Sequence, residues 1–348
     1  MGLPLRDLVT PHELPWEALR GRSVAVDAYN ALYQFLATIR QADGRLFTDP
    51  DGRPTSHLIG VFYRVASLLQ EGVRPVWVFD GRPPERKAGT LRQRLAAKDR
   101  AAEVWQQALE AGDLELARRK AAQTSHLTRP MVDEVRELLA ALGVPTVNAP
   151  SEGEAQAAWM AQRGLVWASA SEDYDSLLFG APRLVRGLAA RGRRGAASVA
   201  QLIDRAELLQ SLGVDDDELV LIGLLIGTDF NEGVRGIGPK RAVQLVRQHL
   251  GWAATVERAG LDPKEAEEVR AIFRHPVVDE TVEIAARPFA PDDVRRILID
   301  QHGFSPERVE ATLERIESAA RRPSGARPSA PAPRGHQTAL DAFGGGAP

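Results

Sequence analysis

Seven acidic residues follow closely on apolar segments that are spread over much of the chain. They are Asp27, Asp80, Glu152, Glu154, Asp173, Asp175 and Asp229. Two like charges about 4 Å apart repel by about 4 kcal/mol at an effective dielectric constant of about 20. A pocket that gathered all seven would therefore take up protons or require cations. Oxygen ligands without cysteine or clustered histidine favour hard ions such as Mg²⁺ or Mn²⁺. The set predicts a two-metal site suited to phosphodiester hydrolysis.

Each acid also has a simpler interpretation when it is taken alone. An aspartate that follows a strand often caps the next helix. Ser151 and Glu154 match the S-x-x-E capping box of a helix expected over 152–163, although capping does not account for Glu152. Asp229 is equally consistent with an ordinary acid at the end of an apolar helix. These alternatives stay open at the level of the sequence.

A cluster of basic residues follows Asp80 and could neutralise part of this acidic charge. Lys87 and Arg94 are seven positions apart, two helical turns, and so lie on the same helix face. We expect both to point at one phosphate above the metal ions. The competing interpretation is a solvated amphipathic face, which is what most charged runs form.

Residues 233–241, GVRGIGPKR, form a glycine-punctuated turn between two expected helices within 215–250. The turn lacks the G-x-x-x-x-G-K-[ST] pattern of a P-loop, and no strand precedes it as a dinucleotide fingerprint requires. A helix–hairpin–helix fits better, because Gly236 and Gly238 allow close approach of a phosphate to the backbone. Lys240 and Arg241 add attraction that is independent of base sequence. A plain structural turn between two helices remains the alternative.

Apolar runs separated by helical patterns must position these groups. Residues 23–26, 75–79 and 165–170 are expected to be buried strands, and residues 31–40, 57–71 and 131–142 helices. This alternation predicts an α/β fold with a mostly parallel central sheet and helices on both faces. The strand ends, and the acids after them, then share one edge of the sheet. Residues 81–130 and 263–320 are expected to be helical, the latter ending in a helix over 309–320.

Composition narrows the class of protein further. The 348 residues are 44% hydrophobic, carry a net charge of −3 and include no cysteine, which excludes disulfides, thiolate zinc sites and a uniformly basic nucleic-acid coat. The longest apolar run, 219–227, is shorter than the roughly 20 residues that a membrane span requires. Arg6 and Asp7 precede any stretch that could serve as a signal core. We expect a cytoplasmic protein without a membrane partner.

Six segments resemble the flap endonucleases of the Rad2/XPG structure-specific nuclease superfamily, archaeal type. They are VAVDAYNALYQF (24–35), TSHLIGVFYR (55–64), VWVFDGRPPERK (76–87), APSEGEAQAAWMA (149–161), ASASEDYDSLLFGAPRLVR (168–186) and IGTDFNEGVRGIGPKRAV (226–243). The resemblance extends to about residue 320 and implies a PIN-like 5′-nuclease fold with a helical arch. It also implies a cytoplasmic location at replication forks of an archaeal cell.

The resemblance implies roles for individual residues. Asp27, Asp80, Glu152 and Glu154 would serve a first metal region, and Asp173, Asp175 and Asp229 a second, for two Mg²⁺ ions, with Mn²⁺ as an alternative. Lys87 and Arg94 match the basic pair that engages the scissile phosphate. Tyr33 matches an aromatic residue that stacks on a base, with a core aromatic residue as the alternative. Gly2 matches a position near the site, and 81–130 would form the gateway for a free 5′ end.

Three further regions acquire functions from the same resemblance. The glycine turn would bind duplex DNA and a potassium ion, and Arg308 would lie where a one-nucleotide 3′ flap is accepted. The segment 337–343, QTALDAF, resembles a peptide that binds the sliding clamp (PCNA), with Gln337, Leu340 and Phe343 as anchors. Gly344 departs from the usual second aromatic residue, which implies weaker binding to the clamp.

The implied organisation has six regions: an N-terminal nuclease region (1–98), a helical cap or gateway (99–130), an internal nuclease region (116–258) with the helix–hairpin–helix (226–250), a C-terminal helical region (259–320), a flexible linker (321–336) and a clamp-binding tail (337–348). The implied activity is that of a monomeric 5′-flap endonuclease and 5′–3′ exonuclease acting on flapped or nicked double-stranded DNA. It would serve Okazaki-fragment maturation and long-patch base excision repair.

Four alternatives remain. A bubble-cutting repair nuclease usually carries a long spacer, whereas only about 50 residues separate Asp80 from the helix at Met131. A plain 5′–3′ exonuclease would need neither an arch nor a clamp tail. A non-catalytic DNA-binding scaffold would not need an intact set of acids. A phosphatase with a D-x-D site would account for Asp173 and Asp175, but not for the glycine turn or the basic helix.

Overall fold

The computed structural model describes residues 5–188, 200–248, 250–285 and 287–321. Its centre is a seven-stranded sheet in the order β1-β7-β6-β5-β2-β3-β4. The strands are β1 (His12–Leu14), β2 (Ser23–Asp27), β3 (Arg74–Phe79), β4 (Thr146–Asn148), β5 (Ala168–Ala170), β6 (Arg183–Arg186) and β7 (Ala200–Asp204). Neighbours from β4 to β6 pair in parallel, while β7 is antiparallel to both β6 and β1. The predicted mostly parallel α/β sheet is therefore confirmed.

The three predicted strands form the middle of this sheet. β2 pairs with β3 on one side and with β5 on the other, with Val26 opposite both Trp77 and Ala170. The third strand is shorter than predicted, because 165–167 are not part of it and the backbone N–H groups of Leu165 and Val166 donate to the carbonyl oxygen of Met160. The four other strands had no counterpart in the sequence prediction.

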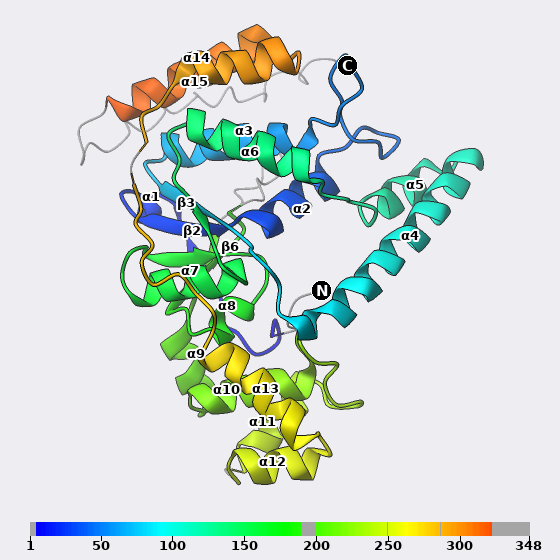
Figure 1. Ribbon diagram of the computed structural model, residues 1–348, viewed down its shortest axis with the longest axis vertical. Helices are drawn as coiled ribbons and strands as arrows, with labels where there is room; N and C mark the ends of the chain where they lie inside the picture. The colour runs from blue at the N-terminus through cyan, green and yellow to red at the C-terminus, as the bar shows by residue number, and fades with distance from the viewer. Residues whose placement is uncertain (1–4, 189–199, 249, 286, 322–348) are drawn as a thin grey trace, which may run out of the picture.

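Helices cover both faces of the sheet, as Figure 1 shows. On one face lie α2 (Ala28–Thr38), α3 (Ser56–Gln70) and α6 (Arg129–Ala141), whose apolar residues share a core with α15 (Pro306–Ala320). On the other face α7 (Gly153–Gln162) packs through Ala157 and Met160 against Val76 and Val78 of β3. The core fixes the strands on both sides, so the carboxyl ends of β2, β3 and β5 form a firm edge.

A helical arm projects from this edge (Figure 1). It consists of a short 3₁₀ turn η1 (Glu85–Lys87), the long helix α4 (Ala88–Glu110) and α5 (Leu114–Ala121). The helical content predicted for 81–130 is confirmed. On α4 from 88 to 100, most residues are exposed, whereas Arg94 and Lys98 are half-buried. One face of α4 is therefore turned toward the body of the protein.

A second helical group extends the body below α7 (Figure 1). Its members are α8 (Asp175–Leu178), α9 (Arg205–Leu212), α10 (Asp216–Ile226), α11 (Pro239–Val246), α12 (Trp252–Ala259) and α13 (Pro263–Arg274). These helices share one apolar core. The prediction of an apolar helix, a glycine turn and a second helix in 215–250 corresponds to α10 and α11.

The prediction that residues 263–320 are helical is wrong in the middle of this range. Between α13 and α14 (Pro291–Arg295), residues 275–285 and 287–290 form neither helix nor strand. Pro276 and Pro288 remove backbone donors there, and β-branched residues such as Val277 and Val278 disfavour helix. Helix returns with α14, the π-helical turn η2 (Arg296–Gln301) and α15. A short helix α1 (Trp16–Leu19) precedes β2. In the part of the chain that the structure describes, no helix is long and apolar enough to cross a membrane.

Candidate metal and nucleic-acid site

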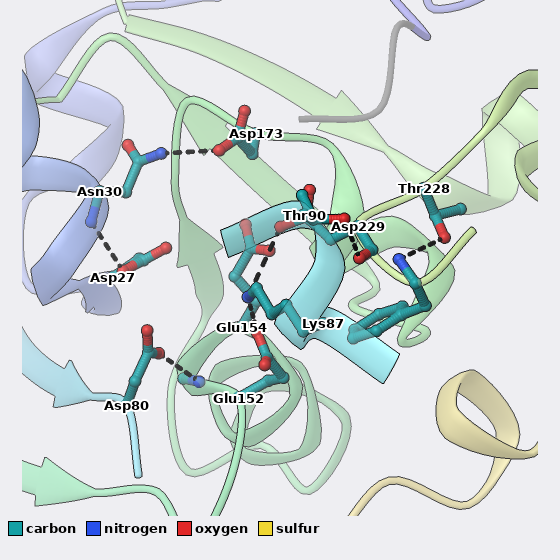
Figure 2. A network of polar contacts seen from close by, with 12 residues as sticks. Asp27, Asn30, Asp80, Lys87, Thr90, Glu152, Glu154, Asp173, Thr228 and Asp229 are labelled. Atoms are coloured by element: carbon teal, nitrogen blue, oxygen red, sulfur yellow. Dashed lines mark hydrogen bonds and ion pairs between the residues drawn. The ribbon is translucent and has the colours of Figure 1, made fainter. Parts of the chain in front are cut away.

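The predicted meeting of acids at one sheet edge is observed. Asp27 is the last residue of β2, Asp80 follows β3 directly, and Asp173 lies in the short loop after β5. Because β5, β2 and β3 are adjacent parallel strands, these three carboxylates lie side by side along the edge. Figure 2 shows them on one side of the site, with the end of the helical arm opposite.

Two of these acids also start helices. Asp27 is the N-cap of α2, and its Oδ1 accepts from the backbone N–H of Asn30 at 3.0 Å. Asp80 accepts at 2.7 Å from the backbone N–H of Gly153, the first residue of α7. A side chain at position 153 would place its Cβ 2.6 Å from Asp80 Oδ1, so glycine is required for this approach. The capping interpretation is correct for Asp27. Its carboxylate nevertheless also belongs to the acidic group at the sheet edge, so the two interpretations do not exclude each other.

The capping box expected at Ser151 and Glu154 is absent. Glu152 occupies the N-cap position of α7, but its own side chain does not cap that end. Glu154 instead accepts from the hydroxyl of Ser171 at 2.9 Å, and the backbone N–H of Asp173 donates to the same Ser171 oxygen at 3.2 Å. Glu152 and Glu154 therefore face the acidic edge. Asp175, the first residue of α8, is 4% exposed.

Asp229 reaches the site from a tight turn after α10. Thr228 fixes this turn, because its hydroxyl donates to Asn231 Oδ1 at 2.8 Å and accepts from the N–H of Phe230 at 3.1 Å. The carbonyl oxygen of Asp229 accepts from the hydroxyl of Thr90 on α4 at 2.9 Å. The turn, and not a helix end, sets the direction of this carboxylate, and the arm contacts it directly.

Two cations of the arm, Lys87 and Arg94, meet the acids from the other side; Figure 2 shows Lys87 there. The ammonium group of Lys87 pairs with Glu152 and lies 3.5 Å from Asp229 Oδ2. Arg94 pairs with the other oxygen of Asp229. Lys87 ends the 3₁₀ turn η1 and Arg94 lies on α4, so they do not share one helix, but both side chains reach Asp229. Their partners in this structure are carboxylates, because these are the nearest negative charges.

Burial and mutual repulsion disfavour ionisation of the acids at the sheet edge. Burial raises the pKa of Asp27 to about 8, and the neighbouring carboxylates of Asp80 and Asp173 add to the shift. Burial raises the pKa of Glu154 well above its usual value as well, and Asp175 and Asp27 reinforce this. The site therefore carries more negative charge than its surroundings stabilise.

The arm reduces this excess without removing it. Burial raises the pKa values of Asp80 and Glu152, although the positive charge of Lys87 opposes both shifts. Burial on its own would lower the pKa of Lys87, but Glu152, Asp229 and Asp80 outweigh it and raise the pKa of the ammonium group. All seven acids are thus connected by contacts or electrostatic effects to one group centred on Lys87 and Glu154.

The donor set fits divalent cations. It consists of carboxylates, without sulfur and without histidine, which is the ligand chemistry of Mg²⁺ and Mn²⁺. Burial raises the pKa values of four of them, Asp27, Asp80, Glu152 and Glu154. In the side-chain arrangement of the described residues, no group of three acids or histidines is spaced to hold an ion directly.

The remaining predicted residues lie outside the acidic group. Tyr33 on α2 is 37% exposed, so it is not a core aromatic residue, and Lys98 Nζ lies 4.2 Å from its ring centre. Gly236, with φ at +83°, lies in the exposed turn before α11. Gly238 is the exposed N-cap of that helix, with φ at −93°. Arg308 is exposed in the first turn of α15.

The other predicted residues are either exposed on α11 or lie outside the described residues. Lys240 and Arg241 are exposed on α11, and Arg241 Nη1 donates to the carbonyl oxygen of Gly236 at 3.4 Å. Gly2 and the tail anchors Gln337, Leu340 and Phe343 lie outside the described residues. Sequence reasoning missed Asn30, Thr90, Ser171 and Thr228, whose contacts orient the acids. Their partners are distant in sequence or belong to a turn, so no motif marked them.

Family models match two separate parts of the chain. The XPG N-terminal domain matches residues 4–101, and the XPG I-region matches residues 143–229. These two matches contain the seven acids and both cations of the arm. The fold and the site together define a structure-specific nuclease of the XPG class.

Individual relatives narrow the assignment. Flap endonuclease 1 of Aeropyrum pernix is 45% identical over 359 residues, which cover 99% of this chain and 100% of that protein. The solved structure of flap endonuclease-1 from Methanococcus jannaschii superimposes with a TM-score of 0.74 at 37% identity, covering 91% of this chain and 98% of the other. The chain belongs to the flap endonuclease family.

A more distant solved structure agrees in fold. The catalytic core of Rad2 in complex with a DNA substrate has a TM-score of 0.69 at 24% identity, and covers 91% of this chain and 100% of that one. This chain therefore shares its arrangement of sheet and helices, and at 24% sequence identity the comparison supports the fold alone.

Proposed function

We propose that the protein hydrolyses phosphodiesters as a 5′-flap endonuclease and 5′–3′ exonuclease, cutting one nucleotide into the duplex at the junction. The observation that carries the proposal is the convergence of seven acids from separate elements on one sheet edge, opposed by Lys87 and Arg94 of a projecting arm. The roles would be Okazaki-fragment maturation and long-patch base excision repair, in the cytoplasm. Membership of the flap endonuclease family supports this assignment.

The acids would hold two divalent ions, with Mg²⁺ preferred and Mn²⁺ as an alternative. Asp27, Asp80, Glu152 and Glu154 would serve one region, and Asp173, Asp175 and Asp229 the other. Bound there, such ions make a water more acidic and stabilise both the attacking and the leaving oxygens. No histidine contacts the acids in the described residues, and nucleases of this family generally depend on divalent metals.

The chain's own residues would bind and orient the scissile phosphate. Lys87 and Arg94 would exchange their carboxylate partners for phosphate oxygens when DNA enters. Phosphate oxygens accept charge-assisted hydrogen bonds from lysine and arginine just as carboxylate oxygens do. Thr90, one turn from Lys87, holds α4 to the carbonyl oxygen of Asp229. The arm therefore enters the site at a defined angle, and the two cations face the strand to be cut.

Duplex DNA would be bound at the exposed turn before α11. Gly236 and Gly238 would admit a phosphate to the backbone, a potassium ion would be held by backbone oxygens, and Lys240 and Arg241 would add charge attraction. Tyr33, exposed on α2, would stack on a base near the cut. Arg308 would lie where a 3′ flap is accepted.

The regions of the chain would divide this work as the sequence suggests. Residues 1–98 and 116–258 would form the nuclease body, 99–130 the gateway and 259–320 a helical region. Residues 321–336 would link this body to a tail, 337–348, that binds the sliding clamp through Gln337, Leu340 and Phe343. Gly2 would lie near the site. The protein would act as a monomer.

A labelled double-flap DNA provides the central test. We expect one cut, one nucleotide inside the duplex, with Mg²⁺ and none with EDTA. Asp229→Ala and Asp175→Ala should abolish cutting while flap binding, measured with Ca²⁺, remains within about threefold of the wild type. Unchanged cleavage by either variant would refute the metal assignment, and binding without any cleavage by the wild type would favour a non-catalytic scaffold.

The same assay separates the proposed enzyme from a plain 5′–3′ exonuclease. A flap with its 5′ end free should be released as one intact oligonucleotide. An exonuclease would instead release single nucleotides from the 5′ end. The projecting arm favours the first outcome, because a helix such as α4 is not needed to trim an end that is already at the site.

A further inference from the structure

We infer that Asn30 is a positioning residue that fixes the carboxylate of Asp173 relative to Asp27 and thereby sets the geometry of the divalent-cation site. The inference rests on the proposed function. It assigns no chemistry to Asn30 itself, which acts through the two acids beside it.

Asn30 makes three hydrogen bonds that join separate elements (Figure 2). Its backbone N–H donates to Asp27 Oδ1 at 3.0 Å. Its side-chain Nδ2 donates to Asp173 Oδ2 at 3.0 Å, and its Oδ1 accepts from the backbone N–H of Glu172 at 3.1 Å. One residue of α2 thus connects the end of β2 with the loop after β5.

The orientation of the Asn30 amide follows from its partners. A carboxylate oxygen can only accept, so it requires the NH₂ group, and a backbone N–H can only donate, so it requires the carbonyl oxygen. A flipped amide would lose both bonds and place two oxygens against each other. The side chain is half-buried, which leaves water little access to replace these bonds.

Asn30 and Ser171 divide the task of holding Asp173. Ser171 accepts from the backbone N–H of Asp173 at 3.2 Å, which fixes the path of the loop. Asn30 holds the carboxylate itself. Without the amide, the loop would keep its path, whereas the carboxylate could turn away from Asp27, whose like charge repels it. Removal of Asn30 should therefore change the site more than it changes the fold.

Groups that orient metal ligands typically contribute about 10- to 100-fold to metal affinity. We therefore expect Asn30→Ala to weaken Mn²⁺ binding about tenfold in calorimetric titrations of the full chain without DNA. Alanine is the best helix former and leaves the backbone N–H to cap α2, so the variant should fold. Thermal unfolding in EDTA verifies this. Asn148→Ala, at the exposed end of β4, is the matched control and should bind Mn²⁺ like the wild type.

A double-mutant comparison separates positioning from a general structural role. In an Asp173→Ala background, Asn30→Ala should change Mn²⁺ affinity by less than about twofold, because the carboxylate it positions is gone. A full tenfold loss in that background would overturn the inference, as would unchanged Mn²⁺ affinity of Asn30→Ala itself. A wild-type protein that binds no Mn²⁺ would overturn the metal site first, and the proposed function with it.

Discussion

The ammonium group of Lys87 pairs with Glu152 and lies 3.5 Å from Asp229 Oδ2. One side chain from the base of the arm thus holds two acids that come from α7 and from the turn after α10. This contact joins three elements that are distant in sequence, at the place where the strand to be cut would lie.

Lys87→Ala should slow the chemical step about 100-fold in single-turnover assays, which is the order of loss when one preorganised donor to a transition state is removed. Binding of flap DNA should change little, because many other cations contribute to affinity. Arg92→Ala, an exposed residue of α4, is the control. A loss of affinity with an unchanged single-turnover rate would make Lys87 a plain phosphate anchor.

Glu154→Gln should raise the melting temperature in EDTA while lowering activity. Burial raises the pKa of Glu154, and Asp175, Asp27 and Asp173 reinforce the shift. The folded state therefore binds the proton more tightly than the unfolded state, and stability falls as the pH rises above about 4.5, the ordinary value. Glutamine does not ionise, so this contribution to the pH dependence of stability is removed. Melting temperatures of the wild type and Glu154→Gln, measured from pH 5 to 9 in EDTA, test this.

Glu154→Gln should also reduce the stabilisation that Mg²⁺ provides, because one carboxylate of the site is lost. A melting temperature that is lower than that of the wild type in EDTA, at every pH, would show that Glu154 stabilises the fold and contradict the prediction.

Asp49→Asn should destabilise the protein at neutral pH, because hydrogen bonds between the carboxylate and its charged partners are lost. Asp49 is 6% exposed and accepts from Arg53 through its backbone N–H at 2.8 Å and its Nε at 2.7 Å. His302 Nδ1 lies 3.2 Å from Asp49 Oδ2, the oxygen that also accepts from Arg53 Nε. The carboxylate therefore connects the loop after α2 to η2 near the C-terminal helix.

The same contacts give the pH dependence a definite sign. Burial alone would raise the pKa of Asp49, but the backbone N–H of Arg53, the His302 ring and the Arg53 guanidinium lower it below its ordinary value of 3.8. The stabilisation is complete above that value and is lost as the pH falls through the lower value of the folded state. The difference in unfolding free energy between the wild type and Asp49→Asn, measured by chemical unfolding, should therefore shrink as the pH falls below 3.8. A constant difference down to pH 2 would contradict this.

Deletion of 337–348 should abolish stimulation by a sliding clamp and leave basal flap cutting unchanged. The segment QTALDAF carries the anchors Gln337, Leu340 and Phe343. Flap cutting is measured with and without clamp, using the full chain for comparison. An equal fall in basal activity would assign the tail to the catalytic body.

The sequence predicted the parts of the fold that have strong local signals. Continuous apolar runs marked β2 and β3, and periodic apolar residues marked α3 and α6. The strands β4 and β6 are three and four residues long and mix apolar with polar residues, so their pairing depends on neighbours that are distant in the chain. Pro276 and Pro288 already indicated an interruption of helix in this region of the sequence. The prediction instead followed the charged, helix-like composition around them.

Five acids of the candidate site were predictable because each follows an apolar segment whose role was recognisable: Asp27, Asp80, Asp173, Asp175 and Asp229. Glu152 and Glu154 follow β4, which was not predicted, and they were noticed as acids in the first turn of an expected helix. The orienting partners of the acids were not predictable. Asn30 lies in a helix that the sequence marks only by its apolar face, and its contact with Asp173 spans 143 positions of the chain. Likewise, the bond from Gly153 to Asp80 becomes visible only when β3 and α7 are placed together.

The double use of Asp27 and Asp80 as helix caps has a consequence for how such an enzyme can be inactivated. A replacement at either position removes a hydrogen bond at the start of α2 or α7 together with a carboxylate of the site. A variant that has lost activity through misfolding would then be hard to distinguish from one that is folded but inactive. Among the residues that the structure describes, the carboxylate of Asp229 caps no helix and pairs with cations of the arm alone. A neutral residue there is the better choice for trapping an intact protein on uncut DNA.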